Sequence, residues 1–252
     1  MKLLLKLAWV ELKLFARDPL GLLFTFAFPL FMLFVLAGVF GNDVDYSDPE
    51  DVKTWRGVGP TNYYVPAYAG LVMASIGVLA LPQRIASYRE RGVLRRFYAA
   101  GISRLAVVGS QVLVAALLSI VGTILVVASA YVAHGADMPH QWLPSLLALA
   151  IGIVTFAAIG VAMGALLPGT RAAQGLGLIA FFMMLLLSGS GPPRAVLPSG
   201  LRATGDLLPL THVVRLLQEP WLGFGWEWQA LAVVLGFFVV ALALAVRFFR
   251  WT

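Results

Sequence analysis

Few residue types in this chain of 252 residues can do catalytic chemistry: it has three histidines, no cysteine and four lysines. Zinc hydrolases use closely spaced histidines, as in HExxH, and no such spacing occurs around His134, His140 or His212. A Walker A loop needs a glycine directly before its lysine, and none of the four lysines follows a glycine. The sequence therefore predicts neither a metal centre nor an ATP site on this chain.

The elements that must carry any function are six long stretches without Asp, Glu, Lys or Arg. Each supplies the roughly 20 apolar residues that a helix needs to cross a membrane, and in lipid a helix satisfies its own backbone groups. The chain is 60% hydrophobic and 12% charged, against about 25% charged in soluble proteins. We expect an all-α membrane protein whose six transmembrane helices lie near residues 20–40, 61–81, 105–133, 143–167, 172–191 and 228–246.

The distribution of Lys and Arg predicts the topology, because cytoplasmic connections are enriched in both. Thirteen of the 18 lie in one set of alternate connections and five in the other. We expect the richer set to be cytoplasmic. The protein would then span a cell membrane with both termini in the cytoplasm and residues 134–141 outside the cell. The basic residues cluster beside helix ends, so the net charge of +6 does not indicate a nucleic-acid partner. The richer set is Lys2, Lys6, Lys13, Arg17, Arg84, Arg89, Arg91, Arg95, Arg96, Arg104, Arg171, Arg247 and Arg250.

Residues 1–18 are predicted to form an amphipathic helix at the membrane interface. Three lysines and Arg17 fall on one side of it, opposite leucines and Phe15. Such a helix places its cations among anionic lipid head groups. Asp18 and Pro19 should end it and begin the first span, because proline disfavours a helical residue before it.

Glu11 interrupts the apolar face of this helix. A charge in apolar surroundings must reach water or find a partner. Two interpretations stay open: the carboxylate reaches the surface or pairs locally, or it pairs with an arginine of the neighbouring cytoplasmic connection. The candidates for the second are Arg89, Arg91, Arg95 and Arg96.

Residues 83–104, after the second span, form the longest and most charged cytoplasmic connection. Within it, residues 93–100 mix aliphatic and aromatic side chains with Arg95 and Arg96, and Gly92 stands where the chain can turn. The pattern predicts a short helix, apolar on one side and basic on the other, that contacts a soluble partner. Ordinary enrichment of positive charge at the inner surface would explain the arginines but not the apolar residues among them.

Residues 188–227 form an outward segment that is too apolar for a solvated loop and too interrupted by five prolines for a span. We expect short helices that dip into the outer leaflet and cap the exit of a path through the protein.

In the fourth span, Gly160 and Gly164 form a GxxxG pair that lets another helix approach closely. No acidic or basic residue falls within the six spans, which argues against a proton-coupled antiporter.

Together these parts resemble the membrane subunit of ABC-2 type exporters, a family that includes daunorubicin-resistance and polysaccharide export permeases. The resemblance covers residues 1–252 as a single domain, and its most specific pieces are YRERGVLRRF and the outward pattern SG…P…LP…L…LPLTH…R. It implies that the first piece is a coupling helix docking into a separate ATPase and the second a pair of re-entrant helices forming an outward gate. The residues so assigned are Arg89, Glu90, Arg91, Gly92, Leu94, Arg95, Arg96 and Phe97 for coupling, and Pro198, Pro209, Thr211, His212 and Arg215 for the gate.

The resemblance also implies partners: two ATPase subunits, which hold ATP and Mg, and a second permease copy, expected to be identical. This chain itself would hold no cofactor and would not be an enzyme. By the same resemblance, the outer ends of spans two and five flank the dimer axis, although residues there also suit plain helix packing. The candidate cargo contacts are Val72, Ser75, Phe181, Phe182, Leu185 and Ser188.

The expected function is that of the transmembrane subunit of an ATP-driven exporter for an amphipathic or lipophilic compound, such as a drug, natural product or lipid. The spans offer Phe, Met, Leu, Ser and Thr but no fixed charge to such a cargo. The alternatives that stay open are a permease for polysaccharide or lipid-linked glycan, an integral-membrane enzyme using the outward histidines, and an ion exporter.

Overall fold

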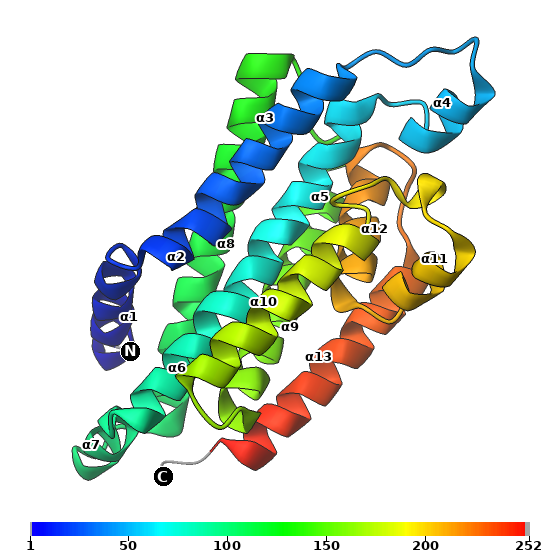
Figure 1. Cartoon of the computed structure of the whole chain (residues 1–252). Helices are drawn as coiled ribbons and strands as arrows, with labels where there is room; N and C mark the ends of the chain where they lie inside the picture. The colour runs from blue at the N-terminus through cyan, green and yellow to red at the C-terminus, as the bar shows by residue number, and fades with distance from the viewer. Residues whose placement is uncertain (1, 250–252) are drawn as a thin grey trace.

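The computed structural model describes residues 2–249, and all of their regular structure is helical (Figure 1). Arg250, one of the cations counted above, lies outside the described residues. The elements are α1 (Lys2–Phe15), α2 (Pro19–Leu22), η1 (Leu23–Ala27), α3 (Phe28–Phe40), α4 (Pro49–Trp55), α5 (Pro60–Ser75), η2 (Ile76–Ala80), α6 (Leu81–Glu90), α7 (Val93–Ala99), α8 (Arg104–His134), α9 (Trp142–Leu166), α10 (Thr170–Leu187), η3 (Arg194–Val196), α11 (Ser199–Gly205), α12 (Pro209–Trp221) and α13 (Trp228–Phe248).

Six of the described helices are long and apolar enough to cross a membrane. The first runs through α2, η1 and α3, the second through α5, η2 and α6, and the others are α8, α9, α10 and α13. They form one bundle, with α7 and both ends of the described chain at one end of it and α4 and α11 toward the other (Figure 1). The predicted all-helical class and number of spans are confirmed.

Local capping groups explain where several helices begin. The Asp18 carboxylate accepts a hydrogen bond from the Gly21 amide at 3.0 Å and caps α2, whose first residue is Pro19. Ser103 caps α8 in the same way, since its hydroxyl accepts from the Ala106 amide. The predicted break between the N-terminal helix and the first span is therefore confirmed.

The second span differs from its predicted length. It was expected to end near Leu81, but α6 continues the helix to Glu90, so the first part of the 83–104 connection is an extension of the span. The short helix predicted within this connection is confirmed as α7. It begins after Gly92, whose backbone is in the left-handed conformation (φ 67°). Glycine adopts this conformation without a steric penalty, and it lets the chain turn sharply out of α6.

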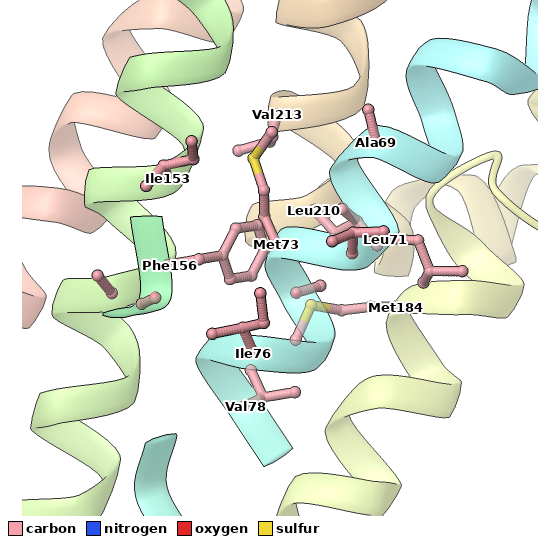
Figure 2. Close-up of a cluster of buried hydrophobic side chains, with 14 of the residues drawn as sticks. Ala69, Leu71, Met73, Ile76, Val78, Ile153, Phe156, Met184, Leu210 and Val213 are labelled. Atoms are coloured by element: carbon pink, nitrogen blue, oxygen red, sulfur yellow. The ribbon is translucent and has the colours of Figure 1, made fainter. Parts of the chain in front are cut away.

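The middle of the second span forms the centre of the core. Residues of α5 and η2 are buried on every side, and Figure 2 shows Met73 and Ile76 of this span beside Phe156 of α9. The predicted close helix approach at Gly160 and Gly164 is confirmed, because a methyl group at Gly164 would lie 2.7 Å from Cβ of Ile85 on α6.

The outward segment folds into η3, α11 and α12, as its prolines predict. Pro198 directly precedes α11, and Pro209 occupies the first turn of α12, where a missing amide hydrogen costs no hydrogen bond. Pro220 differs, since it lies inside the last turn of α12. Nearly all of α12 is buried against α5, α9 and α13, so α12 is part of the packed bundle, whereas most of α11 is exposed.

Candidate coupling site and outward segment

The short helix α7 is fixed to the bundle through its apolar side. Leu94 is only 2% exposed, and the ring of Phe97 packs edge-on against Tyr88 of α6, with ring centres 6.2 Å apart. These two contacts hold α7 at the end of α6, so a force applied to α7 reaches the second span directly.

The other side of α7 carries positive charge. Arg95 and Arg96 on α7, and Arg91 just before it, are exposed and make no ion pair within residues 2–249. Tyr98 beside them is 66% exposed. This basic surface and the buried Leu94 lie on one short helix, which is the two-sided arrangement that the sequence predicts.

Arg89 and Glu90 attach the end of α6 to the connection between α9 and α10. The Arg89 guanidinium donates hydrogen bonds to the carbonyl oxygens of Ala165 (3.1 Å) and Leu167 at the end of α9. The Glu90 carboxylate accepts from the amide (2.9 Å) and hydroxyl of Thr170 at the start of α10. A cation at a helix C-terminus and an anion at an N-terminus both suit the helix dipole. The two side chains therefore join three helices at one end of the bundle.

Glu11 forms an ion pair with the same region. Its carboxylate lies 2.9 Å from the guanidinium of Arg84 and accepts a hydrogen bond from the Tyr88 hydroxyl. Arg84 also donates to the backbone carbonyl of Glu11 at 2.8 Å. A buried carboxylate is tolerable here because both of its oxygens are satisfied.

The predicted pairing of Glu11 with an arginine of the cytoplasmic connection is confirmed, but the four candidate arginines were wrong. Arg84 lies where α6 is still packed inside the bundle, level with α1, whereas Arg91, Arg95 and Arg96 lie beyond the end of α6 and are exposed. Arg89 is engaged by α9. Because the length of α6 was underestimated, Arg84 was overlooked.

The comparison with known families identifies this architecture, since the model of the ABC-2 type transporter membrane domain matches residues 2–222. The chain belongs to the ABC-2 type transporter family. Residues 2–222 form the membrane transport domain of this family. No curated protein sequence matches it.

Family membership supports part of the expected assembly. ABC-2 permeases generally pair with ATPase subunits and typically bind no cofactor themselves. Within residues 2–249 no group of three His, Cys, Asp or Glu side chains is arranged to hold a metal ion.

In this ABC-2 permease, the outward segment is closed by a cluster around the turn between α11 and α12. Asp206 forms ion pairs with Arg194 (2.7 Å) and Arg215 (3.2 Å). The Thr211 hydroxyl donates to the carbonyl of Gly205 at 2.6 Å, and the His212 ring nitrogen lies 2.8 Å from the carbonyl oxygen of Asp206. Three of the five gate residues named from the sequence thus act on one turn.

Arg194 is a member of this cluster that the sequence did not single out. Partial burial, followed by the nearby charge of Arg215, lowers the pKa of Arg194, and the charge of Asp206 acts in the opposite direction. Its guanidinium also donates to the carbonyl of Leu187 at the end of α10. The other two gate residues lie at helix starts: Pro198 is exposed and Pro209 partly buried.

The candidate cargo contacts fall into two groups by exposure. Phe182 is 41% exposed, whereas the others are buried within the single chain. A methyl group at Gly122 of α8 would meet Val72. The Ser75 hydroxyl donates to the Val72 carbonyl and lies 3.4 Å from the Thr25 hydroxyl. Phe181 packs on Phe24 and Phe28. The buried contacts are Val72, Ser75, Phe181, Leu185 and Ser188.

Sequence inspection missed Arg84, Tyr88 and Thr170. Arg84 and Tyr88 are four residues apart, the spacing of neighbours on one helix face, so a longer α6 would have identified both. Thr170 follows a Pro-Gly pair and begins α10, a place where a capping carboxylate is welcome. No local signal shows that this carboxylate comes from Glu90.

Proposed function

We propose that this permease is the membrane half of an ATP-driven exporter that moves an amphipathic or lipophilic compound out across the cell membrane. Two copies of the chain pair with two ATPase subunits, which bind ATP and Mg. A permease for polysaccharide or lipid-linked glycan is the nearest alternative within the family.

The observation that carries the proposal is that α7 is packed on the bundle by one side and exposes a basic surface on the other. Its basic side is free of ion pairs among the described residues, while its apolar side is packed on α6 through Leu94 and Phe97. An exposed basic surface suits an acidic or polar cleft on a soluble partner. Closure of two ATPases then moves α7 and α6 together as one rigid unit.

The cytoplasmic ends of three spans would follow this movement. Arg89 and Glu90 join α6 to α9 and α10, and the pair of Glu11 with Arg84 joins α6 to α1. We therefore assign α1 as the interfacial helix, α7 as the coupling helix and residues 188–227 as the outward re-entrant segment of one domain.

The cargo is tested directly with the assembled complex in proteoliposomes. Daunorubicin and a lipid-linked glycan serve as the two probes, and ATP hydrolysis and accumulation of each probe are measured. Export of daunorubicin with stimulated hydrolysis supports the amphipathic assignment. Export of the glycan alone supports the alternative, and hydrolysis without stimulation by either probe excludes both cargoes.

Phe182 on α10 is the most accessible of the candidate cargo contacts. We expect the double change of Phe182→Trp and Leu185→Trp to obstruct export while basal ATP hydrolysis continues. Ile179→Trp is the matched control, because Ile179 is 59% exposed on the same helix. Export at wild-type rate in the double variant would remove α10 from the cargo path.

Orientation is proposed from the count of basic residues, with both termini and α7 in the cytoplasm. The chain has no cysteine, so Asp137→Cys gives a single labelling site in the connection between α8 and α9. We expect an impermeant maleimide to label it in intact cells. Labelling only after lysis would reverse the topology.

A further inference from the structure

Two of the spans contain a π-helical turn, and the first turn contacts the residue directly before the second. In η1 the Phe28 amide bonds to the carbonyl of Leu23, and in η2 the Leu81 amide bonds to that of Ile76, five residues back in each case. The hydroxyls of Thr25 in η1 and of Ser75, the last residue of α5, are hydrogen-bonded to each other and buried. π-turns inside α-helices are rare and often mark functional sites.

The second span changes its packing partners at η2. Above this turn, α5 packs mainly against α3, α8 and α12, whereas below it α6 packs mainly against α9 and α10. Figure 2 shows the turn from Ile76 to Val78 at this change, with Phe156 of α9 on one side and Met184 of α10 on the other. One continuous helix therefore belongs to two groups of helices.

Glycines line the two carbonyl oxygens of the turn that face α9 and α10. A methyl group at Gly160 of α9 would lie 2.5 Å from the carbonyl oxygen of Gly77, and one at Gly177 of α10 would overlap that of Val78. A methyl group at Gly77 would lie 2.6 Å from the carbonyl oxygen of Phe156. At these points backbone approaches backbone across a glycine, and the side chains of Leu79, Leu81 and Phe156 lie against the same glycines. The glycines leave the space in which the backbone of the turn can shift.

The cytoplasmic ends below the turn cannot slide apart independently, because Arg89 and Glu90 join α6 to the α9–α10 connection. Any relative movement in the second span must then occur above that joint. The π-turn, with its widened backbone and glycine contacts, is the nearest place where the helix can bend.

We propose that η2 is a pivot, at which the unit of α6, α7 and the cytoplasmic ends of α9 and α10 rotates against the unit of α3, α5 and α8. Gly160 and Gly177 are positioning residues of this pivot: they touch no cargo and act by leaving room for the backbone of Gly77 and Val78. The pivot converts a displacement of α7 into a change in the packing of the outer half. It rests on the proposed function, which supplies the displacement.

Distances between spin labels in the assembled complex test the pivot. Arg91→Cys with Arg171→Cys places both labels on the lower unit, and Val132→Cys with Arg171→Cys places them across the pivot. All three positions are exposed. Labelled chain is diluted with unlabelled chain, and distances are compared between the nucleotide-free and the vanadate-trapped states.

We expect the distance across the pivot to shift on trapping and the distance within the lower unit to stay constant. A shift within the lower unit as large as that across it, or no shift across it in a trapped complex, would overturn the pivot. Failure to trap nucleotide at all would instead contradict the proposed function, so the two failures are distinguishable.

Gly177→Ala tests the glycine contacts, with Gly175→Ala as the matched control on the same helix, where an added methyl group meets nothing within 4 Å. We expect Gly177→Ala to lower transport by about ten-fold and to abolish the shift across the pivot, while ATP hydrolysis continues. Gly175→Ala should behave as wild type. Wild-type transport and an unchanged shift in Gly177→Ala would exclude this role. If Gly177→Ala does not fold, the spin-label distances in the chain with its native glycines decide the proposal.

Discussion

The two long connections of this permease, residues 83–104 and 188–227, are both helical, but they place their charged side chains differently. In the cytoplasmic connection, Arg91, Arg95 and Arg96 are exposed without an ion pair in residues 2–249. In the outward segment, Arg194 and Arg215 converge on Asp206. The first connection therefore has unpaired arginines that can contact a partner, whereas two arginines of the second are paired within the segment.

Burial shows the same difference. Only Leu94 of α7 is buried, whereas ten residues of α12 are buried. A short helix with one buried residue can move with whatever binds its open side. A helix enclosed by α5, α9 and α13 moves only with them. Burial thus leaves α7 able to move with a bound partner and fixes α12 to the bundle, as the proposed function requires.

Reversing charge on the open side of α7 should have the largest effect. Arg95→Glu places a like charge opposite an acidic partner, which costs several kcal/mol, so we expect a loss of transport of about a hundred-fold with normal membrane insertion. Phe97→Ala should uncouple transport by releasing α7 from Tyr88. Transport assays in vesicles measure both.

The control for Arg95→Glu is Arg202→Glu, because Arg202 is exposed on α11 of the outward segment. It should transport normally. Equal losses in both variants would mean that the comparison between the two connections is mistaken.

Removing the charge of Glu11 should have the next largest effect. Glu11→Gln leaves Arg84 without its carboxylate in a buried site, and breaking such a pair costs about 3 kcal/mol. We expect a clear drop in the thermal unfolding midpoint of the purified complex. Glu50→Gln is the control, since Glu50 pairs with Lys53 at 3.8 Å on the surface, where a pair contributes about 0–1 kcal/mol. Similar midpoints for the two variants would refute the structural role of Glu11.

Arg89→Ala should destabilise the joint between α6 and α9. Its hydrogen bonds to carbonyl oxygens are charge-assisted, and their loss costs about 2 kcal/mol. We expect earlier hydrogen exchange at the α9–α10 connection, measured by mass spectrometry. Arg91→Ala, at an exposed neighbouring position, should leave exchange there unchanged, and faster exchange in both would assign the effect to charge alone.

Asp206→Asn should give the smallest effect. It removes the shared carboxylate of two partly exposed ion pairs, worth about 1 kcal/mol together. We expect a small decrease in thermal stability and faster exchange limited to residues 194–208. Asp43→Asn, in the connection between α3 and α4, is the control. A global loss of stability in Asp206→Asn would show that the outward segment supports the whole bundle.

The sequence predicted the parts of this fold that depend on local chemistry. Charge-free stretches marked the spans, Asp18 with Pro19 marked the first helix break, and Gly92 marked the start of α7. These signals lie within a few residues of the structure that they specify.

The exact partners in contacts between distant segments could not be predicted. Glu11 and Arg84 are 73 residues apart, and Glu90 and Thr170 are 80 apart. Their pairing depends on how α1, α6 and α10 pack, and on α6 extending one helical segment beyond its apolar part. The sequence gives no signal for the π-turn at η2 either, because its residues Ile76 to Ala80 also suit an ordinary α-helix.

The most direct test of the central claim, that α7 receives the force of an ATPase, is site-specific photo-cross-linking in cells. A benzophenone amino acid is placed at Arg95, and at Arg202 as control. The account predicts that an ATPase subunit with a Walker A sequence is captured from Arg95 and not from Arg202. Co-purification of that ATPase without capture from Arg95, or equal capture from both positions, would contradict it.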